Sequence, residues 1–215
     1  MPSDAEYNER WLKIWSEGLP AGQAFDASKS APALFKLLTS GQLDVRGKRA
    51  LVPGCGRGYD VLLLAQHGAD PAIGLEISSD AVKAAMDYKS QSGAAEDLAS
   101  RALCKEGDFF KYEDGLFEIG YDYTFLCAMH PDMRDRWAEA WARQIKPGGE
   151  LVTLMFPVDA SMPRDQGPPF PLTPELYSEL LSPHGFSRTC FDAVPKEQSH
   201  EGRQGKEFIA RWIKA

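Results

Sequence analysis

The sequence has few cysteines and no long apolar stretch, and both shortages exclude classes of protein. Its four cysteines, at positions 55, 104, 127 and 190, lack the paired spacing that marks a zinc site or a disulfide framework. Reduced thiols in a cytoplasmic protein are the simpler interpretation. No apolar run approaches the roughly 20 residues that span a membrane, and the amino terminus lacks the basic and apolar regions of a signal peptide. We therefore expect a cytoplasmic protein without a metal site or a membrane partner.

Basic residues are also in deficit. The chain has 24 Lys and Arg against 31 Asp and Glu, a net charge of −7 and a pI of about 5.2. Binding to a phosphate backbone needs clustered Lys and Arg, so a nucleic-acid partner is not expected, whereas small-molecule ligands remain possible. With 215 residues, of which 43% are hydrophobic, the chain is predicted to form one globular domain, 1–215, with a sizeable core.

Residues 50–58, Ala-Leu-Val-Pro-Gly-Cys-Gly-Arg-Gly, have the character of a buried strand followed by a glycine-rich turn. The apolar start suits a parallel sheet, and Gly54, Gly56 and Gly58 allow a sharp turn and the close approach of a ligand to the backbone. Apolar residues in 59–67 then recur at helical spacing. Strand, turn and helix form the first half of a nucleotide-binding βαβ unit. A plain strand-to-helix turn would use the same glycines.

An acidic residue after the next strand favours the ligand. Glu76 lies near the carboxyl end of the strand expected at 72–77, where a carboxylate accepts hydrogen bonds from the ribose hydroxyls of an adenosine. Tyr59 occupies the position of the third glycine in dinucleotide-binding turns, which argues against a nicotinamide cofactor, and the Lys-Ser or Lys-Thr of a P-loop is missing. The Gly-x-Gly-x-Gly spacing with an acidic strand end is the pattern of S-adenosylmethionine (SAM) binding. We predict SAM as the cofactor.

Strands and helices alternate through the rest of the chain. Further strands are expected at 102–106, 121–128 and 150–157, with a closing antiparallel pair at 187–194 and 208–213. Since the carboxyl ends of parallel strands meet at one edge of the sheet, Gly54, Glu76, Asp108 and Cys127 should line one crevice. Asp108 can there accept a hydrogen bond from the adenine amino group beside Phe109. A turn or capping aspartate is equally consistent with the sequence.

Two helical segments precede the sheet. An amphipathic helix at 5–18 carries Trp11 and Trp15 one turn apart, a loop with Phe25 follows, and a short helix is expected at 30–38. By spacing alone, the two tryptophans are better explained as a packing stripe. As a lid they would place aromatic faces over a sulfonium cation, an attraction of about 0.5–2 kcal/mol.

Several motifs together resemble the thiopurine S-methyltransferase family, and the branch that looks closest is the plant and fungal halide/thiol methyltransferases. The resemblance runs from about residue 10 to the end and is carried by Trp11-x-x-x-Trp15, Leu51-Val-Pro-Gly-Cys-Gly-Arg-Gly-Tyr-Asp60, Gly74-Leu-Glu-Ile-Ser78, Gly107-Asp-Phe-Phe110, Phe125-Leu-Cys-Ala128, Thr153-Leu-Met-Phe-Pro157 and Gly167-Pro-Pro-Phe170. It implies an α/β fold of class I methyltransferase type. That fold is a Rossmann-like three-layer sandwich whose seven-stranded, mostly parallel sheet has an antiparallel C-terminal strand, here with an N-terminal helical cover at 1–45.

The resemblance also implies a cofactor site. In this family the tryptophans of the first helix line that site, and Phe25 takes the ring position of a tryptophan in the family's Pro-Trp-Asp. Cys127 is expected to touch the methionine moiety through its backbone rather than to act as a nucleophile. The predicted cofactor site comprises Trp11, Trp15, Phe25, Gly54, Cys55, Gly56, Gly58, Glu76, Ile77, Asp108, Phe109 and Cys127.

The acceptor side departs from the family pattern. His130 stands where halide/thiol relatives often have a glutamate, and Phe156 replaces their tyrosine. We predict methyl transfer to a small soft nucleophile, above all a thiol, with halide or hydrosulfide as further acceptors. The alternatives are N- or O-methylation of a small metabolite and, in a different class, a SAM-binding regulatory protein without catalysis.

Charged residues near the expected acceptor pocket complete the prediction. His130 is the candidate base for a neutral thiol, although an exposed loop histidine is equally consistent with the sequence. Arg164 and Arg203 are candidates to attract an anionic acceptor or a substrate carboxylate, and either one taken alone is more readily explained as a solvated surface charge. Beyond the small-molecule acceptor, we expect a monomer or a weak homo-oligomer.

Overall fold

The computed structural model describes residues 4–159, 161–163 and 165–215 of the protein. Its strands are β1 (Ala50–Pro53), β2 (Ala72–Glu76), β3 (Ala102–Glu106), β4 (Phe117–Tyr123), β5 (Ile145–Met155), β6 (Phe186–Ala193) and β7 (Phe208–Lys214). Its α-helices are α1 (Asp4–Ser16), α2 (Pro32–Thr39), α3 (Tyr59–Gln66), α4 (Ser79–Gln91), α5 (Glu96–Arg101), α6 (Arg134–Gln144) and α7 (Pro174–Leu181). Short 3₁₀ turns are η1 (Leu126–Ala128), η2 (Pro131–Met133), η3 (Ser182–His184) and η4 (Lys196–Gln198).

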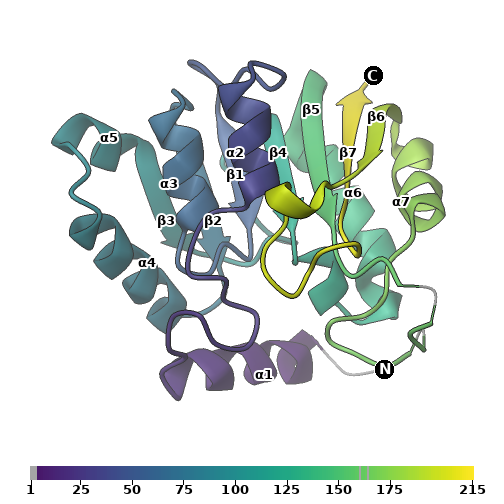
Figure 1. The fold of residues 1–215 in the computed structure, drawn as a ribbon, viewed down its shortest axis with the longest axis horizontal. Helices are drawn as coiled ribbons and strands as arrows, with labels where there is room; N and C mark the ends of the chain where they lie inside the picture. Colours follow the sequence, from purple (N-terminus) through teal and green to yellow (C-terminus); the bar gives the residue numbers. More distant parts are fainter. Residues whose placement is uncertain (1–3, 160, 164) are drawn as a thin grey trace.

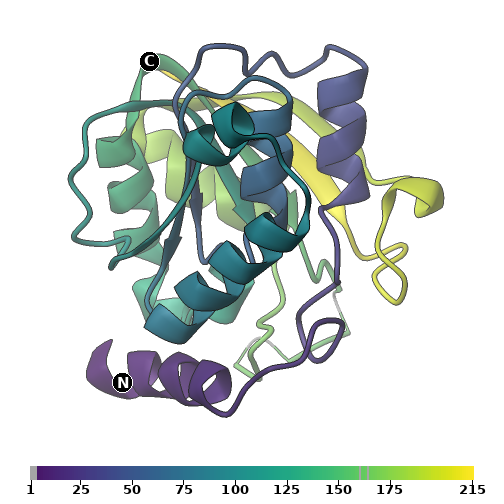
Figure 2. The same cartoon turned by 90° about the vertical axis from the view of Figure 1, so that its left-hand side faces the viewer.

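The strands form a seven-stranded sheet in the order β3-β2-β1-β4-β5-β7-β6, with helices on both faces (Figure 1, Figure 2). Strands β1 to β5 pair in parallel, and β7 runs antiparallel to both β5 and β6. The predicted three-layer α/β fold with an antiparallel C-terminal strand is confirmed. The order reverses between β1 and β4, and in such sheets ligands bind outside the carboxyl ends of the strands at that point.

The fourth strand differs from its prediction. The apolar run predicted a strand at 121–128, whereas β4 ends at Tyr123 and η1 covers the last three residues. Thr124 leaves the strand with a φ of 58°, and the carboxylate of Asp122 accepts a hydrogen bond from the backbone N–H of Leu126 at 3.3 Å. A short apolar run does not distinguish a buried strand from a buried turn, which is why the prediction extended too far. The fifth strand also begins earlier than expected, at Ile145.

Side chains of alternate residues in each strand pack against different helices. In β1, Val52 joins a largely aliphatic core with α2 and α3, whereas Leu51 joins an aromatic core with α6 and α7. Within the second core, the indole N–H of Trp137 donates to the buried carboxylate of Asp122 at 2.7 Å, and that of Trp141 donates at 3.4 Å. Burial raises the pKa of Asp122 to about 6, while these hydrogen bonds favour its charged form.

Helix α1 does not belong to either helical layer. It lies across the carboxyl-end edge of the sheet, at the bottom of Figure 1, whereas α2 packs with α3 in the aliphatic core. The buried ring of Trp15 faces the sheet edge from α1, and Leu34 of α2 is fully buried in the core. The cover predicted for 1–45 is therefore narrower, because α1 and the loop that follows it face the site while α2 supports the sheet.

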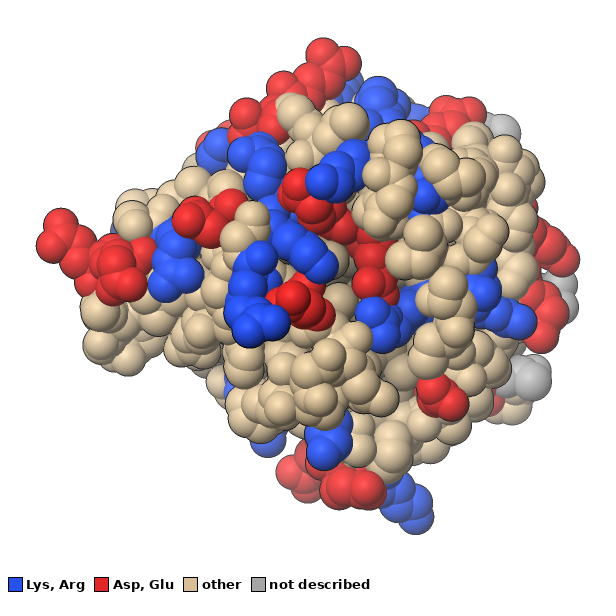
Figure 3. Space-filling model, turned by 90° about the horizontal axis from the view of Figure 1, so that it is seen from above, with Lys and Arg blue, Asp and Glu red and all other residues tan. Residues whose placement is uncertain are grey.

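The opposite edge of the molecule has a mixed surface. Figure 3 views this face and shows Lys and Arg beside Asp and Glu rather than a continuous basic patch. Ion pairs at the amino-end edge of the sheet include Lys146 with Glu118 at 2.6 Å and Arg46 with Asp44 at 2.8 Å. Across the residues that the structure describes, every helix is too short or too polar to cross a membrane.

Candidate cofactor and acceptor site

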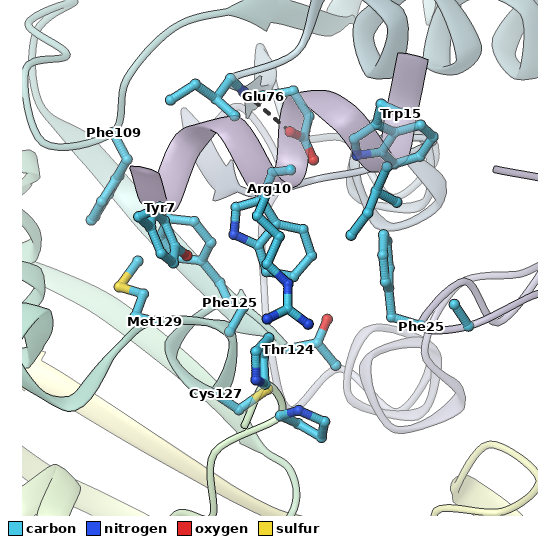
Figure 4. Close-up of a pocket in the computed structure, with 18 of the residues that line it drawn as sticks. Tyr7, Arg10, Trp15, Phe25, Glu76, Phe109, Thr124, Phe125, Cys127 and Met129 are labelled. Atoms are coloured by element: carbon cyan, nitrogen blue, oxygen red, sulfur yellow. Dashed lines mark hydrogen bonds between the residues drawn. The ribbon is translucent and has the colours of Figure 1, made fainter. Parts of the chain in front are cut away.

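A pocket of about 680 Å³ lies between α1 and the carboxyl ends of the parallel strands (Figure 4). This volume is within the range of roughly 300–1,000 Å³ that is typical of small-molecule sites. The predicted site residues that line it are Trp11, Trp15, Phe25, Gly54, Glu76, Ile77, Asp108, Phe109, Cys127, Phe156 and Arg203. The crevice expected from strand order is therefore present.

The other predicted residues lie elsewhere. Cys55 and Gly56 line a smaller adjoining cavity of about 80 Å³. Gly58 caps α3, and His130 is not among the described residues that line either cavity. Arg164 lies outside the described residues.

Glu76 is held in the pocket wall by the glycine turn. One carboxylate oxygen accepts the backbone N–H of Gly56 at 2.8 Å, and the other accepts the backbone N–H of Ile77 at 3.1 Å. Burial raises the pKa of Glu76 to about 7, against the opposing effect of these two hydrogen bonds. Each carboxylate oxygen can accept two hydrogen bonds, so Glu76 retains acceptor capacity for a ligand.

The three glycines of the turn serve different contacts. Gly54 has a φ of 57°, and a Cβ there would lie 2.5 Å from the Phe125 ring in the pocket wall. A Cβ on Gly56 would meet Trp15 at an ordinary 3.6 Å, whereas one on Gly58 would lie 2.9 Å from the sulfur of Cys104. Gly54 therefore shapes the pocket, and Gly58 allows the turn to pack on β3.

An aromatic cluster covers one side of the pocket. The ring of Phe25 packs edge-on against Trp11 and Trp15, with centroid separations of 5.6 Å and 6.1 Å. On the opposite wall, Phe109 packs edge-on against Phe125 at 5.3 Å. Such rings exclude water and present electron-rich faces to a cation.

The loop that carries Phe25 is fastened by a residue that the motif analysis did not assign. The buried carboxylate of Asp26 accepts hydrogen bonds from Arg57 Nε at 2.9 Å and from the Tyr59 hydroxyl at 3.0 Å. On the other side, Arg203 donates to the backbone carbonyl of Phe25 at 2.8 Å. Asp26 directly follows the aromatic residue of this loop, a sequence signal that could have identified it.

Replacing Asp26 with alanine should loosen this loop and raise the dissociation constant of the predicted cofactor, SAM, about ten-fold. The change leaves Arg57 and Tyr59 without their shared acceptor, so the aromatic cover loses its fixed position. Isothermal titration calorimetry measures the effect, with Asp44→Ala as the control because Asp44 pairs with Arg46 on the surface. Equal affinities for Asp26→Ala and the control would show that the fastening does not support cofactor binding.

His130 is not among the described residues that line the pocket, although its neighbour Met129 is. Its ring packs edge-on against Phe170 at 5.9 Å, and its Nδ1 accepts the backbone N–H of Asp132 at 3.3 Å. Phe156 and Arg203 do line the pocket, with the guanidinium 4.9 Å from the ring centroid. Sequence reasoning also missed pocket residues on α1 and after β4, among them Tyr7, Arg10, Thr124 and Met129.

Comparison with known proteins decides the family. The thiopurine S-methyltransferase family matches residues 6–212. The chain belongs to this family. Relatives include "Probable thiol methyltransferase 2" of Arabidopsis thaliana, 36% identical, and "Thiocyanate methyltransferase 1" of Brassica oleracea, 35% identical, each covering 95% of this chain and 84% of the relative. Magnesium protoporphyrin IX methyltransferase from Synechocystis PCC 6803, solved with bound SAM, shares the fold with a TM-score of 0.68 at 16% identity, over 100% of this chain and 93% of its own.

As a member of the thiopurine S-methyltransferase family, the protein is a SAM-dependent methyltransferase, which confirms the predicted cofactor and enzyme class. The residues present fit that cofactor: a buried carboxylate with remaining acceptor capacity, a close backbone turn and an aromatic wall meet in one pocket. Over the described part of the chain, no three His, Cys, Asp or Glu side chains are placed to hold a metal ion.

Proposed function

We propose that this methyltransferase acts on a small soft nucleophile, a thiol above all, with halide or hydrosulfide as further acceptors. The observation that carries the proposal is that the pocket lined by Glu76 is also lined by the apolar side chains of Cys127, Met129, Phe156 and Pro168, with the Arg203 guanidinium against the Phe156 ring. Two of the relatives act, by their names, on thiols and on thiocyanate, which are soft sulfur acceptors. No observation favours methylation of a nitrogen or oxygen acceptor, or a SAM-binding regulatory protein without catalysis.

Several of the predicted cofactor residues that line the pocket have a specific expected contact with SAM. Glu76 would accept hydrogen bonds from the ribose hydroxyls, and Asp108 would accept one from the adenine amino group beside Phe109. Trp11, Trp15 and Phe25 would cover the cation, with Cys127 touching the methionine moiety through its backbone. The bound cofactor supplies an electrophilic methyl group on a positively charged sulfur.

The apolar acceptor end supports this chemistry through its low polarity. An anionic nucleophile and a cationic donor lose charge as they react, so water stabilises the separated reactants more than the transition state. A dry wall such as Met129 and Phe156 reduces that penalty. The chain must also hold the nucleophile in line, about 3–3.5 Å from the methyl carbon.

Because His130 does not line the pocket, we expect the acceptor to enter the reaction in its anionic form, as a thiolate or a halide, without a base from the protein. Replacing His130 with alanine should then change kcat/KM by less than about two-fold, since no proton passes through its imidazole. At a saturating SAM concentration and for a series of thiols, the pH midpoint of kcat/KM should follow the pKa of each thiol. With iodide, kcat/KM should be flat from pH 7 to 9, above the pKa of Glu76. A common midpoint that disappears in His130→Ala would instead assign the histidine as the base.

An acceptor panel tests the proposed function. Alkyl and aryl thiols, hydrosulfide and iodide are compared with matched amines and phenols, and both the methylated product and S-adenosylhomocysteine are quantified. Methylated thiol is the expected product. Methylation of amines or phenols alone would overturn the acceptor assignment, and tight SAM binding without turnover of any acceptor would favour the regulatory alternative.

We further propose that residues 1–215 act as one domain in the cytoplasm, as a monomer or weak homo-oligomer. The family match to residues 6–212 supports the single unit. All four cysteines are free thiols, in keeping with a reducing compartment. The net charge of −7 supports a small-molecule rather than a nucleic-acid ligand.

A further inference from the structure

One cation in the pocket, Arg10, forms no ion pair and no side-chain hydrogen bond with any residue that the structure describes, and its protein contact is the ring of Trp11. We propose that the natural acceptor carries a carboxylate in addition to its nucleophilic sulfur, and that Arg10 of α1 binds this carboxylate. The inference rests on the proposed thiol methylation, because it assigns a second feature to the same acceptor.

Arg10 is placed to reach a ligand. It lines the pocket from α1, and Figure 4 shows its side chain extending from the helix towards Thr124, with the guanidinium in the middle of the pocket and away from the Glu76 carboxylate. Its charged group lies 5.9 Å from the ring centroid of Trp11. Within the described residues, Arg10 has no ion pair or side-chain hydrogen bond, so its donors are available.

Arg203, the other arginine of the pocket, is occupied. One of its nitrogens donates to the Tyr123 hydroxyl at 2.6 Å, and another donates to the carbonyl of Phe25 at 2.8 Å. Tyr123 in turn donates to Glu207, which brings a carboxylate close to the Arg203 charge. Arg203 therefore positions the loop and the strand end, and Arg10 is left as the pocket cation that a ligand can neutralise.

The carboxylates of the pocket wall also leave Arg10 without a counter-charge. Glu76 ends β2 and Asp108 follows β3, Asp108 pairs with Lys111 at 3.3 Å, and Glu201 lies two residues before Arg203. Among the described residues, none of these three carboxylates is paired with Arg10. A guanidinium presents a planar fork of donors that matches a carboxylate in two parallel hydrogen bonds, so a carboxylate-bearing thiol fits this group better than a neutral one.

Matched pairs of thiols test the proposal. Steady-state kinetics compare thiophenol with 4-mercaptobenzoate, and ethanethiol with mercaptoacetate, for the wild-type enzyme, Arg10→Gln, Arg10→Lys and Lys13→Gln. Lys13 is the control because it lies one turn further along α1, outside the pocket wall, and pairs with Glu17 at the surface. In the wild type, KM should be lower for the carboxylate member of each pair.

In Arg10→Gln, the KM of the carboxylate thiols should rise about ten-fold, the cost of a lost charge-assisted pair, while that of the neutral thiols changes less than about two-fold. Arg10→Lys should restore part of the loss, and Lys13→Gln should resemble the wild type. Equal effects on both members of a pair would overturn the proposal, and so would a ten-fold rise in the dissociation constant of SAM, which would assign Arg10 to the cofactor's own carboxylate. If the wild type methylates none of the thiols, the proposed function fails rather than the role of Arg10.

Discussion

Glu76→Ala should raise the dissociation constant of SAM at least about a hundred-fold. The carboxylate is buried, lines the pocket and keeps acceptor capacity on both oxygens after binding the backbone of Gly56 and Ile77. A hydrogen bond to a charged group contributes about 1.5–3 kcal/mol, so the loss of two ribose contacts exceeds two factors of ten. Calorimetric titration with SAM and with S-adenosylhomocysteine measures the change.

The matched control is Glu106→Ala. Glu106 is the register partner of Glu76 on β3, at the same edge of the sheet, but it is exposed and outside the pocket wall. It should bind SAM as the wild type does. If Glu76→Ala also binds normally, the ribose lies elsewhere and the central assignment of the cofactor site is wrong.

The pKa of Glu76 adds a pH dependence to the same prediction. Because burial raises this pKa to about 7, the free protein holds a proton on Glu76 below that pH. Ribose hydroxyls need the charged form as their acceptor, so SAM binding releases this proton at low pH. The affinity should therefore fall by up to about ten-fold for each pH unit below 7 and be constant above it. Glu76→Gln, which has no proton to lose, should bind more weakly and without this slope.

The location of the site could be predicted because it follows from strand order. Gly54, Glu76, Asp108 and Cys127 are far apart in the sequence, but each lies at or soon after the carboxyl end of a parallel strand, and such strands end at one edge of the sheet. The glycine spacing and the acidic strand end then limit the ligand to an adenosine without phosphates. These arguments need only the period of the strands and the chemistry of the turn.

The contacts that α1 and the connecting loops make could not be predicted in the same way. Which face of α1 meets the pocket depends on tertiary docking. Tyr7 lies one turn before Trp11 on the apolar face of the helix, whereas Arg10 carried no sequence signal that separated it from surface residues. His130 precedes a proline, which restricts its backbone, and it caps η2, while its ring packs edge-on against Phe170. Position after a strand end is therefore a weak guide once the chain has turned.

Gly54→Ala should also disable the cofactor site, through shape rather than charge. Its φ of 57° disfavours any side chain, by about 1–2 kcal/mol, and the added Cβ would lie 2.5 Å from the Phe125 ring. That ring packs against Phe109 at 5.3 Å, so it cannot retreat without moving the pocket wall. We expect SAM affinity to fall on the order of a hundred-fold, because a ligand held close to the backbone tolerates little displacement.

Gly47→Ala is the control that separates the two effects of Gly54→Ala, the backbone strain at positive φ and the contact of the added Cβ with Phe125. Gly47 has a similar φ of 66°, is exposed, and would place its Cβ more than 4 Å from any other group. Thermal unfolding should show a backbone penalty of a few degrees in Tm in both variants, with a further loss in Gly54→Ala from the contact with Phe125. Calorimetry should show weakened SAM binding in Gly54→Ala alone. If the two variants bind SAM equally well, the glycine turn serves only to turn the chain, and the ligand does not depend on the shape of this wall.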